Sequence, residues 1–183
     1  MIVVNYDKDS IASSLNQAVD EFVAYVKAMD EKSFENAPAG KWNAGQQLDH
    51  LIRSIRPLNL AYALPLFTLK LMFGKANRNS RTYAGLVEKY ESKLAGGGKA
   101  SGRFIPAAVS FASKEKFCGH YKKEKEKLVG KIQKFNEQDL DTYVLPHPLL
   151  GKLTLREMLF FTIHHNEHHL NLVKKYSIPQ GIN

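Results

Sequence analysis

The apolar side chains of this sequence repeat mainly at spacings of three and four residues, which is the period of an amphipathic α-helix. In the first such segment, Ile11, Leu15, Val19, Phe22 and Val26 form one stripe. The pattern predicts four long helices, at about residues 10–29, 44–56, 113–135 and 154–176. No segment shows the sustained alternation of a strand, so we expect an all-α fold.

Capping residues suggest where these helices begin. Asp9 or Ser10 is a candidate cap for the first helix, and Asn43 is one for the second. Residues 154–157 read Thr-Leu-Arg-Glu, a capping box directly before an apolar run, and they give the firmest boundary. Pro57 is expected to bend or end the second helix.

Between the second and third helices lies a long connection. Its first part, residues 57–73, is the most apolar stretch of the chain, but it is shorter than the roughly 20 residues of a membrane span and is interrupted by Pro65 and Lys70. We expect it to be buried or to line a cleft. Residues 74–113 are rich in turn formers, with one short helix expected at 83–94. The glycines at 96–98 do not match a phosphate-binding loop, because Ala100 follows Lys99.

These elements predict a four-helix bundle with a long crossover between helices two and three, forming a single domain over residues 1–183. The composition, 44% apolar and 24% charged, is that of an ordinary globular protein. The only cysteine, Cys118, has no partner for an intramolecular disulfide, which favours a reducing compartment. The apolar run at residues 2–4 is too short for a signal peptide, so we expect a cytoplasmic protein.

Positive charge is concentrated in two stretches. The formal net charge is +8, and the excess of Lys and Arg lies in residues 70–103 and 114–134. Such a band attracts nucleic acid, anionic lipid or acidic metabolites. Residues 122–127 alternate Lys and Glu as on a solvated helix face, and no nucleic-acid motif accompanies them. We therefore expect neither a nucleic acid nor a membrane as partner.

Four of the seven histidines lie within six positions of the last predicted helix, at 164, 165, 168 and 169. At about 100° per residue, His165 and His169 share a face with the apolar stripe that starts at Leu155, whereas His164 and His168 point to the opposite side. Two buried imidazoles one turn apart leave polar atoms that cost about 1–3 kcal/mol each if unpaired, and a divalent ion satisfies both.

A third ligand must come from elsewhere in the chain. The candidates are His50, His120 and His147. His50 lies beside the apolar stripe of the second helix, His120 lies in a lysine-rich helix and is expected to face solvent, and His147 lies between two prolines, where its direction cannot be predicted. We select His50, so the predicted metal ligands are His50, His165 and His169.

Several of these segments together resemble the DinB/YfiT-like superfamily. They are Trp42 followed by Leu-Asp-His-Leu at 48–51, His-Pro-Leu-Leu-Gly-Lys-Leu-Thr at 147–154, and His-Asn-Glu-His-His-Leu at 165–170. The resemblance covers nearly the whole chain. It implies a four-helix bundle with a long crossover, a divalent metal held by His50, His165 and His169, and frequent homodimers. Leu172 departs from the resemblance, because relatives often have glutamine or histidine near that position.

The resemblance does not fix the reaction, because members include metal-dependent hydrolases, thiol transferases and proteins without an assigned activity. Three neutral histidines leave an open coordination position for water or substrate, as in catalytic sites, and imidazole suits Zn, Ni or Fe. We expect a metal-dependent hydrolase of a small molecule. The alternatives are a thiol S-transferase, whose anionic thiol the basic residues would attract, and a non-catalytic binding module.

No motif identifies a general base. The sequence lacks H-E-x-x-H, and Glu167 lies off the inward stripe. Asp49 could orient a ligand, but an exposed acid is the more typical interpretation. Cys118 is a poor candidate nucleophile because no Cys–His partnership is evident. Four further side chains could line a pocket: Arg53, Tyr62, Tyr83 and Tyr121.

Overall fold

The computed structural model describes residues 7–177, and the expected all-α fold is confirmed. Four long helices correspond to the predicted ones. They are α1 (Lys8–Lys27), α3 (Ala44–Ala61), α6 (Lys114–Ile132) and α8 (Leu155–Ser177). The short apolar run at residues 2–4, on which the expectation of no signal peptide depends, lies outside the described residues.

Shorter elements connect the long helices. They are α2 (Glu31–Glu35), α4 (Leu66–Phe73), α5 (Tyr83–Ala95), two 3-10 turns (Gly102–Phe104 and Phe111–Ser113), α7 (Glu137–Thr142), β1 (Val144–His147) and β2 (Gly151–Thr154). The predicted crossover between the second and third long helices is therefore present and carries α4 and α5. No helix in the described part of the chain combines the length and hydrophobicity that crossing a membrane requires.

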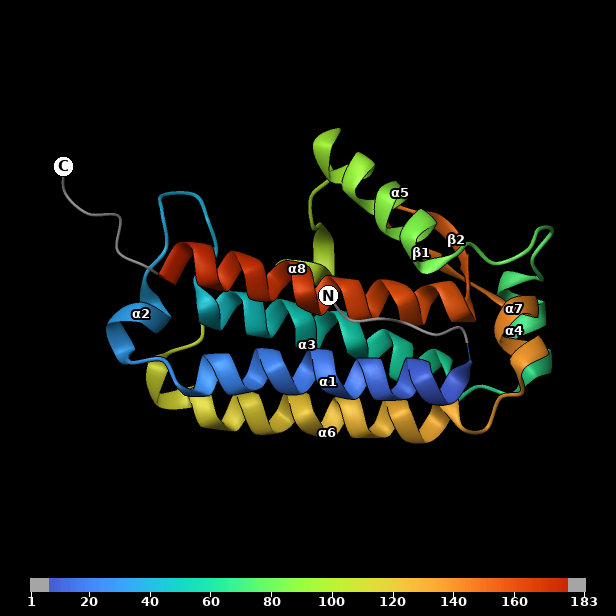
Figure 1. The fold of residues 1–183 in the computed structure, drawn as a ribbon, viewed down its shortest axis with the longest axis horizontal. Coiled ribbons are helices and arrows are strands. Elements are labelled where there is room, and N and C mark those ends of the chain that lie inside the picture. The colour runs from blue at the N-terminus through green and yellow to red at the C-terminus, as the bar shows by residue number, and fades with distance from the viewer. Residues whose placement is uncertain (1–6, 178–183) are drawn as a thin grey trace.

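The four long helices lie side by side, and α1 and α3 each pack against both α6 and α8 (Figure 1). Helix α5 lies across α8 on the outside of this assembly (Figure 1). The predicted apolar stripe of α1, from Ile11 to Val26, is completely buried. Full burial of one such side chain contributes about 1.5–3 kcal/mol, so the stripe contributes strongly to the packing of α1. Phe22 of this stripe meets Tyr121 of α6 edge to face, with 6.2 Å between ring centroids.

One helix boundary differs from expectation, and another, which the sequence leaves open, is defined by the structure. The cap of α1 is Asp7, whose carboxylate accepts a hydrogen bond from the backbone N–H of Ser10, so neither Asp9 nor Ser10 caps this helix. Helix α3 continues through Pro57 to Ala61. The turn after the proline is held by tertiary contacts, because the side-chain amide of Asn59 donates to the backbone oxygen of Glu124 in α6 over 2.9 Å.

The β1–β2 hairpin was not predicted. It pairs four residues with four, in the register Val144 with Thr154 and His147 with Gly151. Strands this short give no recognisable alternation, and the flanking prolines indicate only a turn. Gly151 has φ +75°, a conformation that glycine adopts without the cost incurred by a side chain.

The expectation that residues 57–73 are buried or line a cleft is wrong for much of the segment. Leu69 is buried, but Leu60, Phe67, Leu71 and Met72 are among the most exposed large apolar side chains of the molecule. Helix α4 is apolar on nearly all sides, so a helix lying on the surface must expose part of it. This segment therefore contains more apolar side chains than the described fold buries.

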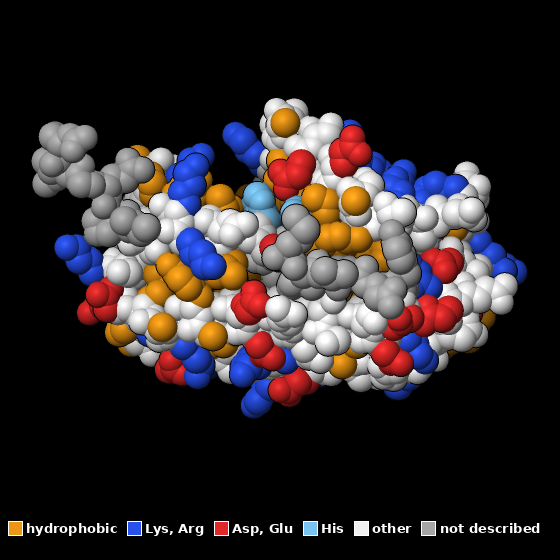
Figure 2. Space-filling view, in the orientation of Figure 1, with side chains coloured by type: hydrophobic (Ala, Val, Ile, Leu, Met, Phe, Trp, Pro, Cys, Tyr) orange, Lys and Arg blue, Asp and Glu red, His pale blue; other side chains and the backbone are white. Residues whose placement is uncertain are grey.

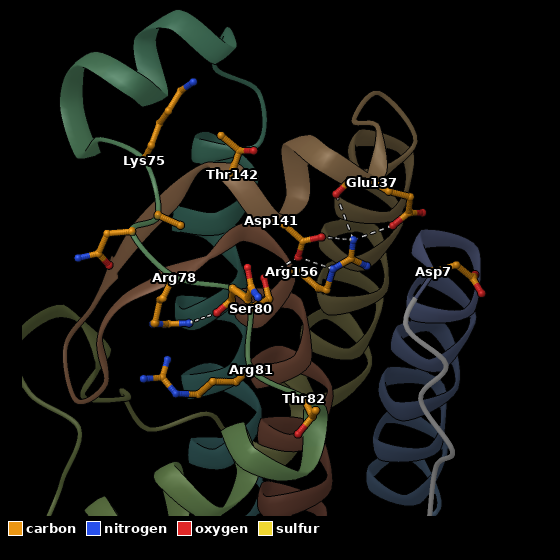
Figure 3. Close-up of a pocket in the computed structure, with 13 residues that line it drawn as sticks. Asp7, Lys75, Arg78, Ser80, Arg81, Thr82, Glu137, Asp141, Thr142 and Arg156 are labelled. Carbon is orange, nitrogen blue, oxygen red and sulfur yellow. Dashed lines mark hydrogen bonds and ion pairs between the residues drawn. The ribbon is translucent and has the colours of Figure 1, made fainter.

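A buried polar cluster joins the crossover to the start of α8. The carboxylate of Glu157 is fully buried and accepts hydrogen bonds from both terminal nitrogens of Arg78, at 2.6 and 2.8 Å, and from the backbone N–H of Arg81 at 2.7 Å. On the neighbouring side, the guanidinium of Arg156 binds Asp141 of α7 (Figure 3). These contacts fix where the crossover leaves the helices, and hence where α5 lies.

Candidate metal centre

The first turn of α3 is fixed by a capping box. The side-chain oxygen of Asn43 accepts from the backbone N–H of Gln46 at 2.9 Å, and the Gln46 side chain accepts from the backbone N–H of Asn43 at 3.2 Å. This confirms Asn43 as the cap. Gln47 and His50 follow one turn apart on the inner face of α3, and both are buried. The local sequence thus positions an amide and an imidazole side by side.

The start of α8 is fixed in the same way. The hydroxyl of Thr154 accepts from the backbone N–H of Glu157 at 3.1 Å, and the Glu157 carboxylate accepts from the backbone N–H of Thr154 at 3.0 Å. The predicted capping box is therefore present. His165 and His169 lie one turn apart further along α8, and both are buried, as the helical pattern predicted.

The structure brings the three predicted histidines together. The Nε2 atom of His165 lies 3.2 Å from Nε2 of His50 and 2.9 Å from Nε2 of His169. One nitrogen from each ring lies within 4.8 Å of the others. We call these three residues the histidine triad. Within residues 7–177, no carboxylate or cysteine joins the triad to make a larger group of this kind.

Hydrogen bonds at the other ring nitrogen determine the tautomer of two triad members. Nδ1 of His50 donates to the backbone oxygen of Phe104 at 2.7 Å, and Nδ1 of His169 donates to the side-chain oxygen of Gln47. Oxygens of this kind only accept, so both rings carry their hydrogen on Nδ1. The Gln47 amide is itself oriented, because its nitrogen donates to the backbone oxygen of Trp42. In the neutral rings, Nε2 of His50 and of His169 therefore presents a lone pair to the centre of the triad.

This arrangement fits a divalent metal ion. Tetrahedral coordination at about 2.0–2.1 Å from each nitrogen places ligand nitrogens roughly 3.3 Å apart, close to the two observed separations. Burial and the neighbouring imidazoles hold the pKa of His165 and of His169 well below the ordinary value. Burial also lowers the pKa of His50, although its contact with Phe104 opposes the shift. Protonation of the three imidazoles is thus disfavoured. The neutral rings can direct nitrogen lone pairs at a metal cation.

Aromatic rings surround the triad. Trp42 stacks on His169, with ring centroids 6.5 Å apart and planes inclined by 12°, and its centroid lies 5.1 Å from that of His50. Phe161 stacks on His165 at 4.7 Å. These rings restrict rotation of the imidazoles and lower the local dielectric constant, which strengthens electrostatic interactions at the centre.

A cavity of about 810 Å³ opens over the triad. Its walls come from α3, α5, α8, the hairpin and residues 98–105, and all three triad members line it. Histidine side chains come to the surface beside α5 (Figure 2). The volume is within the range of about 300–1,000 Å³ typical of small-molecule sites. The centre therefore faces a space large enough for a substrate.

The lining of this cavity is apolar with a basic component. Its large apolar residues include Leu58, Leu94, Leu149, Met158, Phe161 and Leu172. Lys41, Lys99 and Arg103 also line it and are exposed. No aspartate or glutamate of the described ranges is among the lining residues. The cavity thus favours a ligand with an apolar portion and no positive charge.

The remaining histidines have other surroundings. His120 lies away from the cavity and pairs with Arg56, at 3.0 Å, in agreement with its expected position near solvent. His164 turns toward α5 and lies 3.0 Å from the carboxylate of Glu91. His168, expected to point away from the core, instead lines the cavity, and so does His147. Helix α5 and the hairpin enclose space on the outer side of α8, and therefore a residue outside the apolar stripe of α8 reaches the cavity.

Sequence reasoning missed several residues that shape the site. Asp49 is not an exposed acid but a buried one, which accepts from Arg53 at 2.6 Å and from the backbone N–H of Ala107 at 2.7 Å. It thereby holds the loop that supplies the Phe104 oxygen. Tyr90 of α5 lines the cavity, whereas Tyr62 and Tyr121 are core residues that hydrogen-bond within the bundle.

Comparison with known proteins identifies the family of the chain. No curated protein and no solved structure matches the chain. A sequence model described as the DinB superfamily matches residues 14–173, a range that includes the whole histidine triad. Since this match spans most of the 183 residues, the chain belongs to the DinB superfamily.

Proposed function

We propose that this protein binds a divalent metal ion through His50, His165 and His169 and uses it to hydrolyse a small-molecule substrate. The observation that carries the proposal is the convergence of three buried Nε2 atoms beneath a cavity, with separations of 2.9 and 3.2 Å. His50, His165 and His169 are the only His, Cys, Asp or Glu side chains that converge there among the described residues, so they would leave a coordination position of the ion open for water or substrate.

A divalent ion held by three neutral imidazoles acts as a Lewis acid that lowers the pKa of water toward about 7 and polarises a carbonyl oxygen. The protein residues prepare this chemistry. Gln47 and the Phe104 oxygen keep the Nδ1 hydrogens in place, which leaves Nε2 free to bind. Trp42 and Phe161 exclude water from the sides of the triad.

Metal content tests the binding part of this proposal. Protein purified without a histidine tag is expected to hold about one metal ion per chain. The variant in which all three triad members are replaced by alanine is expected to hold almost none. His120→Ala is a matched control, because His120 lies outside the cavity and is expected to leave the metal content unchanged. Equal metal content in the triple variant and the native protein would reject the site.

Hydrolysis is tested separately. Metal-loaded protein is assayed against esters, amides and lactones that combine an apolar portion with a neutral or anionic one, as the cavity lining favours. Activity is expected to disappear on chelation, to return with added metal, and to be absent from the triple variant. If no substrate is cleaved faster by the native protein than by the triple variant, the hydrolase assignment is rejected, while the proposal of metal binding is unaffected.

The cavity lining also favours a second candidate, thiol S-transfer. Lys41, Lys99 and Arg103 provide three cations for an anionic thiol, and the cavity volume of about 810 Å³ accommodates a peptide-sized molecule. Reduced glutathione is a suitable probe, with S-methylglutathione as the thiol-blocked control. A ligand at 100 times its dissociation constant stabilises by about 2.7 kcal/mol, which raises Tm by roughly 5–10 °C in a chain of this size. Equal shifts with both compounds would contradict coordination by the thiol.

The proposal includes the homodimer and the cytoplasmic location expected from the sequence. The exposed side chains of Phe67, Leu71 and Met72 form an apolar surface on α4 that a second copy of the chain would cover. Light scattering across a dilution series measures the molar mass. A monomer mass at every concentration would contradict the dimer and leave the metal centre unaffected.

A further inference from the structure

His147 belongs to the cavity wall but not to the triad. It is the last residue of β1, and the turn that follows folds back onto its ring. Nδ1 of His147 accepts hydrogen bonds from the backbone N–H groups of Leu149 and Leu150, both at 3.2 Å. The same turn is held from outside, because Nζ of Lys89 in α5 donates to the Leu150 oxygen at 2.6 Å.

These contacts determine where the ring carries its hydrogen. A nitrogen that accepts two N–H groups must present its lone pair, so the hydrogen of a neutral His147 is on Nε2. Burial, aided by the positive charge of Lys89, lowers the pKa of His147 to about 4. The ring is therefore neutral at pH 7 and acts as a hydrogen-bond donor through Nε2.

This donor is available to a ligand. No residue in the described part of the chain hydrogen-bonds to Nε2 of His147. Within the same ranges, no fully buried side-chain nitrogen or oxygen lacks a partner, so Nε2 is accessible rather than sealed in the core. The cavity over the triad is the space that His147 lines.

The position of His147 relative to the triad is also defined. Its ring meets the edge of Phe161, with 4.3 Å between centroids and an interplanar angle of 68°. Phe161 in turn stacks on His165. His147 thus lies one aromatic ring away from a triad member, which suits contact with a part of the substrate next to the reacting group.

We propose that His147 donates a hydrogen bond from Nε2 to a carbonyl or carboxylate oxygen of the substrate and so orients it over the triad. This proposal rests on the proposed function, because it assigns a substrate contact at that site. It excludes His147 as the general base, since the nitrogen that faces the cavity carries a hydrogen. It also specifies the substrate class: a molecule with an apolar portion and an oxygen acceptor one ring width from the reacting bond.

The tautomer is tested first, on protein with 15N-labelled histidine, both metal-free and zinc-loaded. Two-bond proton–nitrogen correlation at pH 7 is expected to show the Nε2–H form for His147, assigned by the loss of its signals in His147→Gln. A hydrogen on Nδ1, or a doubly protonated ring, at pH 7 would overturn the proposal. This measurement needs neither substrate nor turnover.

Binding is tested with hexanoate, which combines an apolar chain with oxygen acceptors, by calorimetry on the zinc-loaded protein. His147→Phe, which keeps a ring without N–H, is expected to weaken binding by about 10- to 100-fold, the usual loss for a hydrogen bond to a charged group. His147→Gln keeps an N–H at similar reach and is expected to retain most of the affinity. His147→Asn keeps an acceptor for the turn, but its side chain is too short to reach the ligand. This variant is therefore expected to fold and to bind hexanoate weakly.

The outcomes separate this proposal from the proposed function. Equal affinity in the native protein, His147→Phe and His147→Asn, or no measurable hexanoate binding by the native protein, would overturn the role of His147. Binding that depends on His147, together with a complete absence of hydrolysis, would support the substrate contact and reject the hydrolase. Circular dichroism melts of each variant ensure that only folded proteins are compared.

Discussion

Replacing Glu157 by glutamine tests how strongly the polar cluster at the start of α8 holds the crossover. The carboxylate has no exposed surface, and it accepts five hydrogen bonds: three from the side chains of Arg78 and Arg81, and two from the backbone N–H groups of Arg81 and Thr154. Glutamine keeps the shape but removes the charge, and it turns an N–H toward groups that are themselves donors. The substitution therefore leaves donors without acceptors.

The expected loss can be worked out from this geometry. Removing one partner of a buried ion pair costs about 3–5 kcal/mol. Arg78 and Arg81 are 34% and 32% exposed, so water can solvate them partly once the charge of Glu157 is gone. We therefore expect a loss at the lower end, about 3 kcal/mol, which corresponds to a decrease in Tm of roughly 6–12 °C for a chain of this size.

Urea unfolding at pH 7, followed by circular dichroism, measures the free energy of unfolding. Glu126→Gln is the matched control, because Glu126 is exposed on α6, and its substitution is expected to change stability by no more than about 0.5 kcal/mol. A loss below about 1 kcal/mol in Glu157→Gln would refute the reasoning, since it would mean that water replaces the carboxylate at no cost.

The pH dependence provides a second check. Burial raises the pKa of Glu157, but the hydrogen bonds from Arg78 and from the backbone of Arg81 and Thr154 outweigh it and bring the pKa below its ordinary value of 4.5. The carboxylate therefore contributes its full stabilisation above pH 4.5, and this contribution is lost as the pH falls through the folded-state pKa. The stability gap between native protein and Glu157→Gln is expected to narrow from pH 7 to pH 3. A stability difference that does not change between pH 7 and pH 3 would contradict the view that it arises from the charge of Glu157.

Two further predictions concern α3 and the metal centre. In Gly45→Ala the new Cβ would lie 2.8 Å from the backbone oxygen of Val109, so we expect a loss of about 1–3 kcal/mol in urea unfolding; Gly119→Ala in α6 meets no atom within 4 Å and is expected to gain up to about 1 kcal/mol. A stabilised Gly45→Ala variant would contradict this reasoning, since it would mean that the backbone around Val109 moves away without cost. Gln47→Leu removes the acceptor that orients His169 and is expected to weaken Ni²⁺ binding by about 10- to 100-fold. Quenching of the single tryptophan, Trp42, measures this affinity because its ring stacks on the triad, and unchanged affinity would contradict the role of Gln47.

The long helices could be predicted because each has a single buried stripe. The stripe from Ile11 to Val26 is fully buried, and the caps at Asn43 and Thr154 are where the sequence indicates them. The hairpin could not be predicted, since its strands have four residues each and their pairing depends on the turn at Gly151. The exposure of α4 was missed for a different reason: apolar composition shows that a segment tends to be buried, but not what covers it.

The triad could be predicted from the positions of its histidines relative to the apolar stripes of two helices. Side chains on these faces point into the bundle, where they can contact one another. The groups that orient the triad carry a weaker signal. Gln47 shares a face with His50, and this spacing could have identified it, but a polar residue in the first turns of a helix is usually exposed. The oxygen of Phe104 is a backbone atom, so no side chain in the sequence reveals it.

The two parts of the site therefore have different origins in the chain. The triad comes from α3 and α8, two helices of the bundle, and their packing would bring these rings together whatever the substrate. The residues above it, including Lys99, Tyr90 and His147, come from the crossover and the hairpin. Helix packing thus explains how the triad forms, while the connections supply much of the wall of the cavity above it. Under the proposed function, specificity would therefore depend on α5, the loop at 98–105 and the β1–β2 turn, and substitutions there should change the substrate without changing metal content.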